Sequence, residues 1–566
     1  MTDQIQLDLV QSPDPLVLAV LAFAAATGLV LTLLGLISSL HALQQDDYSN
    51  LRFARWLWSS KGRLVHPWIA LIYAVGVVAQ LNLGTSSARP AELAAPLLAS
   101  VAAILATVRS PRRAPRKKPL VYTGRARRLL AVSVALAAIL FVAGGGFAAR
   151  FVDPHLTVTS SYLPGLAILI MAPVTIHAAP FLAMAANLCL VPVQATINWS
   201  YRVRAGRKLA RLGPMVIGIT GSYGKTSTKY FTEALMGSRF RVLKTRASFN
   251  TILGVCRAIN EELGPEHEVL IVEMGAYRRG EIRDMARLCK PHIGVLTAIG
   301  PQHLERFGSI ETIERAKFEL LEALPADGIA VVNNDDPRVR RLADGLTLPQ
   351  VRRYGIDFSA GELDLRADSI EHGPDGLAFN LVDREGKRVT VQTRLIGLHN
   401  VSNILAAATV ARAANVSLRE IAGAISGLQP VPHRLETHTG ADGVTIIDDA
   451  YNSNPVGAFN ALDTLAEFKT GRKILVTPGM VELGGEQEVW NEKLGRKAAA
   501  ICDYVILVGT RQTAPTRRGL EAEGFAPDRL LAVKNLTDGL EALRGIVRAG
   551  DVVLFENDLP DLYDEE

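Results

Sequence analysis

The sequence predicts an N-terminal α-helical transmembrane domain followed by two α/β domains. Apolar residues are concentrated in the first third of the 566 residues, in segments of membrane-spanning length. After about residue 213, short apolar runs alternate with helix-length amphipathic stretches, which is typical of parallel sheets flanked by helices. A glycine-bearing loop, IGITGSYGKTSTK at 217–229, opens this second part. A chain of this length exceeds one hydrophobic core, so several domains are expected.

The first predicted domain consists of apolar segments that are long enough to cross a bilayer. Residues 15–40 carry no charged side chain over a length that spans about 30 Å of hydrocarbon. A cleavable signal peptide is disfavoured here because no Lys or Arg precedes the segment. Prolines in the last segment, 162–195, leave open one kinked span or a hairpin. We expect a multi-span domain of about five helices at 1–200, with further segments at 67–84, 91–108 and 129–149.

Basic loops predict the orientation of these helices. The stretch RSPRRAPRKKPLVYTGRARR at 109–128 and the juxtamembrane linker at 201–212 are both strongly basic, as is the loop at 41–66. The N-terminus is acidic instead. Five crossings with an outside N-terminus therefore place every basic loop in the cytoplasm, in a multi-pass protein of the inner cell membrane. The 109–128 stretch either only orients the chain or also binds anionic lipid head groups.

Two separate series of apolar runs predict the two α/β domains. The first contains PMVIGIT, EVLIVEMG, IGVLTAIG and GIAVVNND, and a hairpin-like patch at 377–395 interrupts it. The second begins after about residue 431 with GVTIIDD and continues through KILVTPG, DYVILVG, RLLAVK and DVVLFEN. We therefore predict a central P-loop, ATPase-like domain at 213–431 and a Rossmann-like C-terminal domain at 432–566.

The loop at 217–229 has the features of a phosphate-binding loop. An apolar strand at 214–220 runs into a glycine turn, and a helix is expected from Lys225. Backbone N–H groups at such a helix start bind anions, Lys225 reaches the β- and γ-phosphates, and Thr226 can hold Mg²⁺. The usual glycine at position 219 is Ile219 here, with glycine at 218. We expect ATP to bind through Gly221, Ser222, Gly224, Lys225, Thr226 and Ser227.

Nine stretches in a fixed order carry a resemblance to a known family. They are TGSYGKTSTK, FNTILGV, VEMGAYRRGEI, QHLERFGSIETIERAK, NNDD, GLHNVSNILAAATVA, HRLE, IDDAYNSNP and GMVELG. Together they resemble the Mur ligase family, within it the branch that adds D-alanyl-D-alanine to UDP-N-acetylmuramoyl-tripeptide. The resemblance spans about 213–556. It implies an ATP-dependent ligase that joins a carboxylate to an amine through an acyl phosphate.

The resemblance also implies the metal and catalytic residues. Thr226 and Glu273 would hold one Mg²⁺, and His303 and Lys317 a second. Glu273 ends an apolar strand, where an ionised carboxylate is expensive without a cation. The periodicity of ETIERAKFELLEAL places Lys317 on the apolar face of a helix, where a lysine snorkels, is paired or loses its charge. The family converts this lysine to a carbamate, so Lys225, His303 and carbamylated Lys317 are the implied catalytic groups.

Further residues are implied to bind the nucleotide. The adenine-side set comes from the strand end at 333–336 and from GLHNVSN at 397–403. The C-terminal domain would bring two more residues to the phosphates when it closes. Alone, each would be read as a cap or turn residue. The full set is Asn333, Asp336, His399, Asn400, Asn403, Arg434 and Asp449.

Three departures from the family pattern bear on the substrates. Membrane segments stand where the family has its UDP-sugar-binding domain. His433-Arg434 replaces the usual Gly-Arg, and Gly479 replaces the usual Asp before M-x-E-L-G. The ending FENDLPDLY replaces a glycine- and serine-bearing loop. The acceptor carboxylate is therefore UDP-linked or lipid-linked, and the amine is an amino acid or dipeptide that need not be D-alanyl-D-alanine.

The sequence thus predicts a membrane-anchored amide ligase for peptidoglycan or a related envelope polymer. Its expected partners are ATP, Mg²⁺, the two substrates and membrane lipid, and no nucleic acid. Poly-γ-glutamate-type synthetases also combine a Mur-like core with membrane segments, but IDDAYNSNP and GMVELG favour the first branch. An ATP-driven transporter lacks support because no L-S-G-G-Q-like signature occurs and few charges lie in the membrane segments. A catalytically dead scaffold is disfavoured by retention of the implied site residues.

Overall fold

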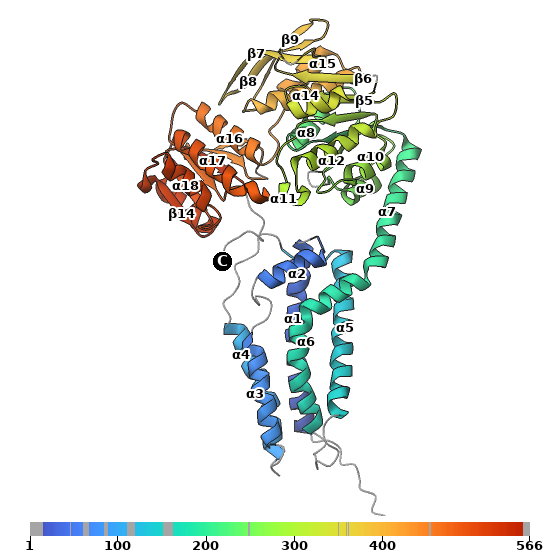
Figure 1. Ribbon diagram of the computed structural model, residues 1–566, viewed down its shortest axis with the longest axis vertical. Coiled ribbons are helices and arrows are strands. Elements are labelled where there is room, and N and C mark those ends of the chain that lie inside the picture. Colours follow the sequence, from blue (N-terminus) through green and yellow to red (C-terminus); the bar gives the residue numbers. More distant parts are fainter. Residues whose placement is uncertain are drawn as a thin grey trace, which may run out of the picture. The chain divides into compact units, whose positions relative to one another are not determined.

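The structure is a computed structural model with two compact units, Met1–Ile197 and Asn198–Glu566, here called the N-terminal and C-terminal units (Figure 1). The acidic N-terminus that orients the chain lies outside the described residues, and so do residues 110–118 of the basic 109–128 stretch. Those residues are 15–45, 47–59, 67–83, 89–109, 119–150, 162–246, 249–348, 350–357, 359, 361–451 and 454–557.

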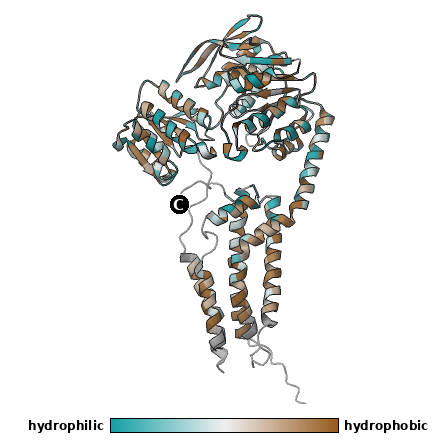
Figure 2. Ribbon diagram, in the orientation of Figure 1, coloured by the Kyte–Doolittle hydropathy of each residue, from teal (hydrophilic) through white to brown (hydrophobic). Residues whose placement is uncertain are grey.

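The described part of the N-terminal unit is helical. Three stretches, Pro15–Gln45, Gly124–Phe147 and Gly165–Cys189, are long and apolar enough to cross a membrane, and two apolar helices are shorter. Figure 2 shows how strongly apolar residues dominate these helices. Tyr162–Cys189 is one helix, so the hairpin alternative is not adopted. The helices are α1 (Pro15–Gln45), α2 (Asn50–Ser59), α3 (Pro67–Leu83), α4 (Arg89–Arg109), α5 (Gly124–Arg150) and α6 (Tyr162–Cys189).

Small residues bring α1 and α6 together. A Cβ on Gly28 would lie 2.8 Å from the Cβ of Ala172, so only glycine allows this approach. Between the same helices, the hydroxyl oxygens of Thr32 and Thr175 lie 3.1 Å apart. Large apolar side chains point outward instead, among them Val142, which is 73% exposed. This distribution of small residues inside and large apolar residues outside is typical of helices packed in lipid.

The C-terminal unit contains two sheet domains. In the first, a nine-stranded sheet has the order β2-β3-β1-β4-β5-β6-β7-β8-β9. The strands from β2 to β7 pair in parallel, and β7, β8 and β9 are antiparallel, as the hairpin-like patch predicts. The strands are β1 (Met215–Thr220), β2 (Val242–Lys244), β3 (Val269–Glu273), β4 (Ile293–Leu296), β5 (Ile329–Asn333), β6 (Gln350–Gly355), β7 (Leu365–Gly373), β8 (Gly376–Asp383) and β9 (Arg388–Thr393).

Helices cover both faces of this sheet because its strands are apolar on both sides. Along β1, Ile217 packs in a cluster with Phe231 of α8, whereas Val216 packs in the opposite cluster with Leu320 of α12. Helices on the first face are α8 (Lys225–Met236), α14 (His399–Ala413) and α15 (Leu418–Ser426). Those on the second are α9 (Ile252–Glu261), α10 (Glu281–Cys289), α12 (Ile310–Glu322) and α13 (Pro337–Asp344).

Gly218 explains the shifted glycine of the loop sequence. A Cβ at this position would lie 2.9 Å from Cδ1 of Leu320, so glycine lets α12 pack directly on β1. Ile219 faces the opposite layer and belongs to its core. The glycine at 218 and the isoleucine at 219 are therefore explained by the packing of helices on the two faces of the sheet.

Helix α7 (Val191–Leu212) includes the basic stretch at 201–212. Within the C-terminal unit, Ala205 and Leu209 are buried in the cluster that contains α9 and α10. Lys208 Nζ donates a hydrogen bond of 3.0 Å to the carbonyl oxygen of Asn260. The stretch therefore packs on the first sheet domain as a helix.

The second sheet domain has six strands in the order β10-β11-β15-β12-β13-β14. Only β10 and β11 pair antiparallel. Its strands are β10 (Glu436–Thr439), β11 (Thr445–Asp449), β12 (Lys473–Thr477), β13 (Tyr504–Val508), β14 (Leu530–Val533) and β15 (Val552–Glu556). Its α-helices are α16 (Pro455–Glu467), α17 (Gln487–Ile501), α18 (Ala514–Ala522) and α19 (Leu536–Ile546).

Candidate functional site

The predicted site lies at the carboxyl ends of the central parallel strands. The glycine loop follows β1, Glu273 ends β3, and Asn333 ends β5. After β3 the chain crosses β1 to continue as β4, so loops from neighbouring strands diverge here. Such a reversal of strand order leaves a crevice at the carboxyl edge, where ligands of open α/β sheets bind.

Two glycines give the loop after β1 its shape. Gly221 has φ 151°, and a Cβ there would lie 2.0 Å from the hydroxyl oxygen of Thr297. Gly224 has φ 77°, and a Cβ there would lie 2.4 Å from Oδ1 of Asn403. A side chain at either position would both strain the backbone and fill the concave surface of the loop. The loop is thus a cradle of backbone atoms.

Helix α8 begins directly after this cradle. Its first hydrogen bond runs from the N–H of Thr228 to the carbonyl of Gly224. The preceding N–H groups, including those of Thr226 and Ser227, have no partner within the helix and carry the positive end of its dipole. Ser222 differs because its side chain is buried and its hydroxyl exchanges 3.0 Å hydrogen bonds with Gly300. The Ser222 side chain therefore joins the loops after β1 and β4, and only its backbone faces the cradle.

Lys225 folds back over the loop that it follows. Its Nζ donates to the carbonyl oxygens of Gly221 at 2.7 Å and Ser222 at 2.8 Å. The pKa of Lys225 is lowered to about 8, chiefly by burial and also by the charge of Arg434, whereas Glu273 opposes the shift. A cation held in this way can exchange its carbonyl partners for phosphate oxygens.

This lowered pKa predicts a pH-dependent affinity for nucleotide. Phosphate favours the charged ammonium, so above pH about 8 the protein must take up a proton when it binds ADP. The Kd for ADP is therefore expected to rise by up to roughly tenfold per pH unit above that value. Calorimetric titrations between pH 7 and 10 would measure it. Lys225→Arg should remove the slope because guanidinium stays charged; an unchanged slope in that variant would contradict the assignment.

Glu273 is paired with a lysine that the sequence reasoning missed. Lys229 Nζ lies 2.8 Å from Oε2 of Glu273, and both side chains are almost fully buried. Burial alone would raise the pKa of Glu273, but Lys229 and Lys225, with hydrogen bonds from Lys229 and Asn250, hold it below its ordinary value. The expected cation beside Glu273 is thus present in the protein itself. The signal was available, since helical spacing places Lys229 on the same face of α8 as the buried residues Thr232 and Met236.

His303 is held by a second residue that the sequence reasoning did not assign. Its backbone is left-handed, with φ 54°, and its Nδ1 is hydrogen-bonded to Oε2 of Glu482. The other oxygen of Glu482 accepts a 3.0 Å hydrogen bond from Arg306. Burial lowers the pKa of His303, and Lys225 and Lys317 lower it further, against the effect of Glu482. Glu482 belongs to GMVELG, so this stretch fixes the orientation of the imidazole and leaves Nε2 for another partner.

Lys317 is buried on α12, as the periodicity predicts, and does not snorkel. Only 3% of the residue is exposed, and its Nζ lies 5.8 Å from the ring centre of Phe307. Burial, followed by the charge of Lys225, lowers its pKa well below the ordinary value, whereas Glu273 and Glu281 raise it. Among the described residues no carboxylate is hydrogen-bonded to it. A neutral amine is the form that reacts with CO₂.

The residues after β5 have structural partners. Asn333 Oδ1 accepts a 3.0 Å hydrogen bond from the N–H of Asp335. Asp336 caps α13, and its Oδ2 accepts a 2.8 Å hydrogen bond from the N–H of Ile299. Asp336 therefore connects the end of β5 to the loop after β4. This is the loop that Ser222 of the cradle also contacts.

The residues of GLHNVSN are also brought to the cradle. Asn403 lies against Gly224 and donates a 3.2 Å hydrogen bond to Oδ1 of Asn400. Asn400 donates in turn to the carbonyl of Ile396 at 2.9 Å. Burial, with a contribution from the charge of Arg434, lowers the pKa of His399 to about 4, so this imidazole is neutral. Its Nδ1 is buried and lacks a hydrogen-bond partner in the described part of the chain.

Arg434 and Asp449 come from the second sheet domain. The guanidinium of Arg434 lies 4.8 Å from the ring centre of Tyr451, and its charge lowers the pKa values of Lys225 and His399. Asp449 accepts a 3.3 Å hydrogen bond from the N–H of Leu435. Burial raises the pKa of Asp449 to about 6, although Arg434 opposes this. Arg434 therefore lies close enough to the cradle to act on its charges.

The residues present fit a nucleoside triphosphate and a divalent cation. The cradle supplies backbone N–H groups for phosphates, and two buried polar atoms beside it, Tyr223 Oη and His399 Nδ1, have no hydrogen-bond partner within the described ranges. Buried atoms of this kind are uncommon in proteins without a ligand to satisfy them. The carboxylate of Glu273 and the hydroxyl of Thr226 are oxygen ligands of the type that Mg²⁺ prefers.

Two family models match the chain. One describes the Mur ligase middle domain and matches residues 219–411; the other describes a Mur ligase, glutamate ligase domain and matches residues 433–556. Residues 1–218 lie outside both matches.

Curated proteins and solved structures give the same result. The chain is 34% identical over 372 residues to the UDP-N-acetylmuramoyl-tripeptide--D-alanyl-D-alanine ligase of Mycobacterium leprae, covering 61% of this chain and 71% of that protein. The protein of the same name from Bacillus subtilis is 31% identical over 351 residues, covering 62% of this chain and 74% of that protein. The structure of MurF ligase from Thermotoga maritima in complex with ADP aligns with a TM-score of 0.57 and 26% identity, covering 65% of this chain and 81% of that chain.

Proposed function

The chain belongs to the Mur ligase family and is an ATP-dependent, ADP-forming peptide ligase of the MurF type in peptidoglycan synthesis; we propose that in this ligase the N-terminal helices are a membrane anchor and that the acceptor is lipid-linked. The observation that carries the chemistry is the grouping of Lys225, Glu273, His303 and Lys317 beside the glycine cradle. The pKa of each of these side chains is shifted by the charge of at least one other member of the group.

The residues divide the chemistry between them. Lys225 holds the β- and γ-phosphates of ATP while an oxygen of the acceptor carboxylate attacks the γ-phosphorus and ADP leaves. The amine nitrogen then attacks the acyl carbon, loses a proton and displaces phosphate. Arg434 of the second sheet domain adds positive charge beside the phosphates. Positioning and charge stabilisation are the main contributions of a protein to phosphoryl transfer.

Thr226 and Glu273 would hold one Mg²⁺, and His303 and Lys317 a second, and the ions would neutralise phosphate charge. Glu482 keeps His303 oriented for this role through its hydrogen bond to Nδ1. The remaining residues of the loops, Ser222, Asn333, Asp336, Asn400 and Asn403, hold the cradle in place around the nucleotide.

Lys317 is proposed to carry a carbamate, which turns a buried amine into an anionic metal ligand. With ¹³C-labelled bicarbonate, the parent protein is expected to show a carbamate carbonyl resonance that is missing in Lys317→Ala. Lys290→Ala, which removes an exposed lysine, should keep the resonance. Full ADP release by a parent protein that shows no carbamate resonance would contradict this role.

The membrane anchor is supported by the three long apolar helices and by their outward-facing apolar side chains. Phe181 and Ile139 are both 63% exposed, and a surface of such residues is unstable in water. The basic stretch on α7 follows the apolar helices and precedes the cradle in the sequence, and it is expected on the cytoplasmic side. The catalytic domains would therefore face cytoplasmic ATP.

A lipid-linked acceptor follows from the same anchor. A carboxylate carried on a membrane lipid stays in the plane in which the ligase is held, so its effective concentration is high. The family matches begin at residue 219, within β1, and most of the described residues before β1 belong to the helices α1 to α7. An amino acid or dipeptide such as D-alanyl-D-alanine would supply the amine.

The proposal is tested in two steps on the full chain. Membranes washed with alkaline carbonate should retain the protein, since a spanning helix resists this treatment whereas a peripheral protein is released. Detergent-purified protein with ATP, Mg²⁺, acceptor and amine should form ADP and peptide product in equal amounts. Release into the wash would contradict the anchor, and ADP formation without product would contradict the ligase.

A further inference from the structure

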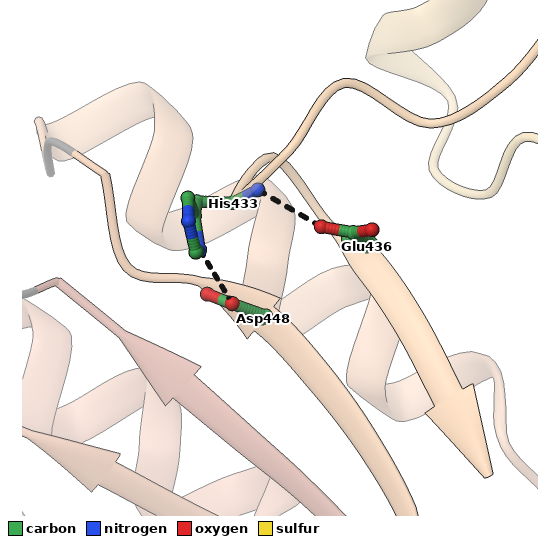
Figure 3. A group of neighbouring side chains, drawn as sticks. All are labelled: His433, Glu436 and Asp448. Carbon is green, nitrogen blue, oxygen red and sulfur yellow. Dashed lines mark hydrogen bonds and ion pairs between the residues drawn. The ribbon is translucent and has the colours of Figure 1, made fainter.

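The β10–β11 hairpin carries a group of side chains of metal-ligating types, none of which is among the residues assigned to ATP. His433 precedes β10, Glu436 begins it, and Asp448 stands opposite Glu436 on β11. One ligand atom from each of the three lies within 4.8 Å of the others. Figure 3 shows the imidazole of His433 directed at Asp448, with Glu436 beside the same turn. A second imidazole, that of His438, lies two residues beyond Glu436 on the same face of β10.

In each carboxylate, one oxygen accepts a hydrogen bond from a backbone N–H and the other oxygen lies next to an imidazole nitrogen. Oδ1 of Asp448 accepts a 3.0 Å hydrogen bond from Ala450, and Oδ2 lies 2.7 Å from Nδ1 of His433. Oε2 of Glu436 accepts a 3.2 Å hydrogen bond from the N–H of His433, and Oε1 lies 3.3 Å from Nε2 of His438. The carboxylates are therefore oriented before any ligand arrives.

The backbone at His433 adopts a conformation that is uncommon for residues other than glycine. Its φ of 58° is left-handed, a conformation that costs free energy for residues other than glycine. This conformation turns the imidazole toward the carboxylate of Asp448, as Figure 3 shows. Leu435, two residues later, has φ 47°. The turn thus contains two residues in a strained backbone conformation and places the imidazole beside the carboxylates.

The donor set selects the kind of ligand. Two carboxylates with two imidazoles suit a divalent transition ion, because imidazole nitrogen binds Zn²⁺ well whereas Mg²⁺ prefers oxygen ligands. We propose that His433, Glu436 and Asp448, joined by His438, bind one Zn²⁺ ion. Zn²⁺ binds the deprotonated form of each ligand atom, so any proton on these atoms passes to solvent when the ion binds.

The consequence for catalysis rests on the proposed function. Arg434 lies between two of the ligands, so an ion held by His433 and Glu436 fixes the backbone on both sides of it. The guanidinium of Arg434 acts on the charges of Lys225 and His399. The Zn²⁺ site would therefore hold in place the arginine that the second sheet domain presents to the nucleotide.

Zinc binding is measured first, without reference to activity. Full-length protein in detergent is stripped with a chelator and titrated with Zn²⁺ against a chromogenic competitor, with ADP and excess Mg²⁺ present to occupy the oxygen-rich site. One Zn²⁺ per chain is expected. His433→Ala and Glu436→Gln should each weaken binding by roughly tenfold or more. His372→Ala is the matched control, because His372 forms a comparable pair with Glu467 at 2.8 Å, to which no third ligand is added among the described residues.

A spectroscopic measurement on the parent protein keeps the test independent of how the variants fold. X-ray absorption at the zinc edge should show nitrogen and oxygen ligands with imidazole scattering; sulfur scattering would place the ion on a cysteine and overturn the proposal. Failure of the parent to bind Zn²⁺, or equal binding by Glu436→Gln, would overturn it as well.

The link to Arg434 has its own readout. Zinc removal should raise KM for ATP several-fold in the parent and leave KM unchanged in Glu436→Gln. If the parent shows no ligase activity, the proposed function fails while the zinc stoichiometry remains measurable. If zinc binds but KM does not respond, the site exists and its role in placing Arg434 is wrong.

Discussion

The Lys225→Met protein is expected to release ADP roughly 10²–10³-fold more slowly than the parent, because one preorganised charge at the transferring phosphate contributes about that much. Methionine keeps the length of the side chain and removes the ammonium that now bonds the carbonyls of Gly221 and Ser222. The rate is measured as ADP release under saturating ATP, acceptor and amine.

Lys497→Met is the control for loss of a lysine elsewhere in the C-terminal unit. Lys497 pairs with Asp463 at 2.7 Å on the second sheet domain, and its removal should leave the rate within about twofold, since exposed pairs contribute little. Product formation by Lys225→Met at the parental rate would show that the cradle does not hold the reacting phosphate.

Lys229→Met is expected to lower the thermal midpoint of the C-terminal unit by roughly 10 °C. The substitution leaves the carboxylate of Glu273 buried without its cation, which costs about 3–5 kcal/mol. The pair is almost completely buried, so water cannot replace the lost partner. Differential scanning calorimetry of the full chain in detergent measures the shift.

The double variant Lys229→Met with Glu273→Gln removes both charges and should recover most of the lost stability, because an uncharged amide no longer needs a cation. Lys244→Met serves as a matched single variant, since Lys244 forms an ion pair with Glu233 that remains partly exposed. A midpoint for Lys229→Met equal to that of Lys244→Met would contradict a buried ion pair at this position.

The sheet architecture and the location of the site were predictable because they depend on local patterns. Apolar runs ending in Thr220, Glu273 and Asn333 mark strands whose carboxyl ends meet, and the glycines at 221 and 224 mark the cradle between them. The burial of Lys317 followed from helical periodicity alone.

The missed residues depend on contacts that no local pattern records. Glu482 reaches His303 from 179 residues away, and Lys229 meets Glu273 across two elements. Ser222 and Asp336 are predicted to bind the nucleotide, and the sequence does not reveal that their side chains also bond the loop after β4. A motif in the sequence indicates which residues to consider, whereas only the fold shows which neighbours they contact.

The most direct test of the membrane-anchored ligase compares two acceptors with the full chain in lipid vesicles. ADP release is measured with ATP, Mg²⁺ and D-alanyl-D-alanine, adding either UDP-N-acetylmuramoyl-tripeptide or a membrane lipid extract that contains peptide-bearing lipids. A ligase that takes its acceptor from the membrane will respond to the lipid extract and little to the UDP compound. A response to the UDP compound alone would contradict a lipid-linked acceptor and leave the helices only as an anchor.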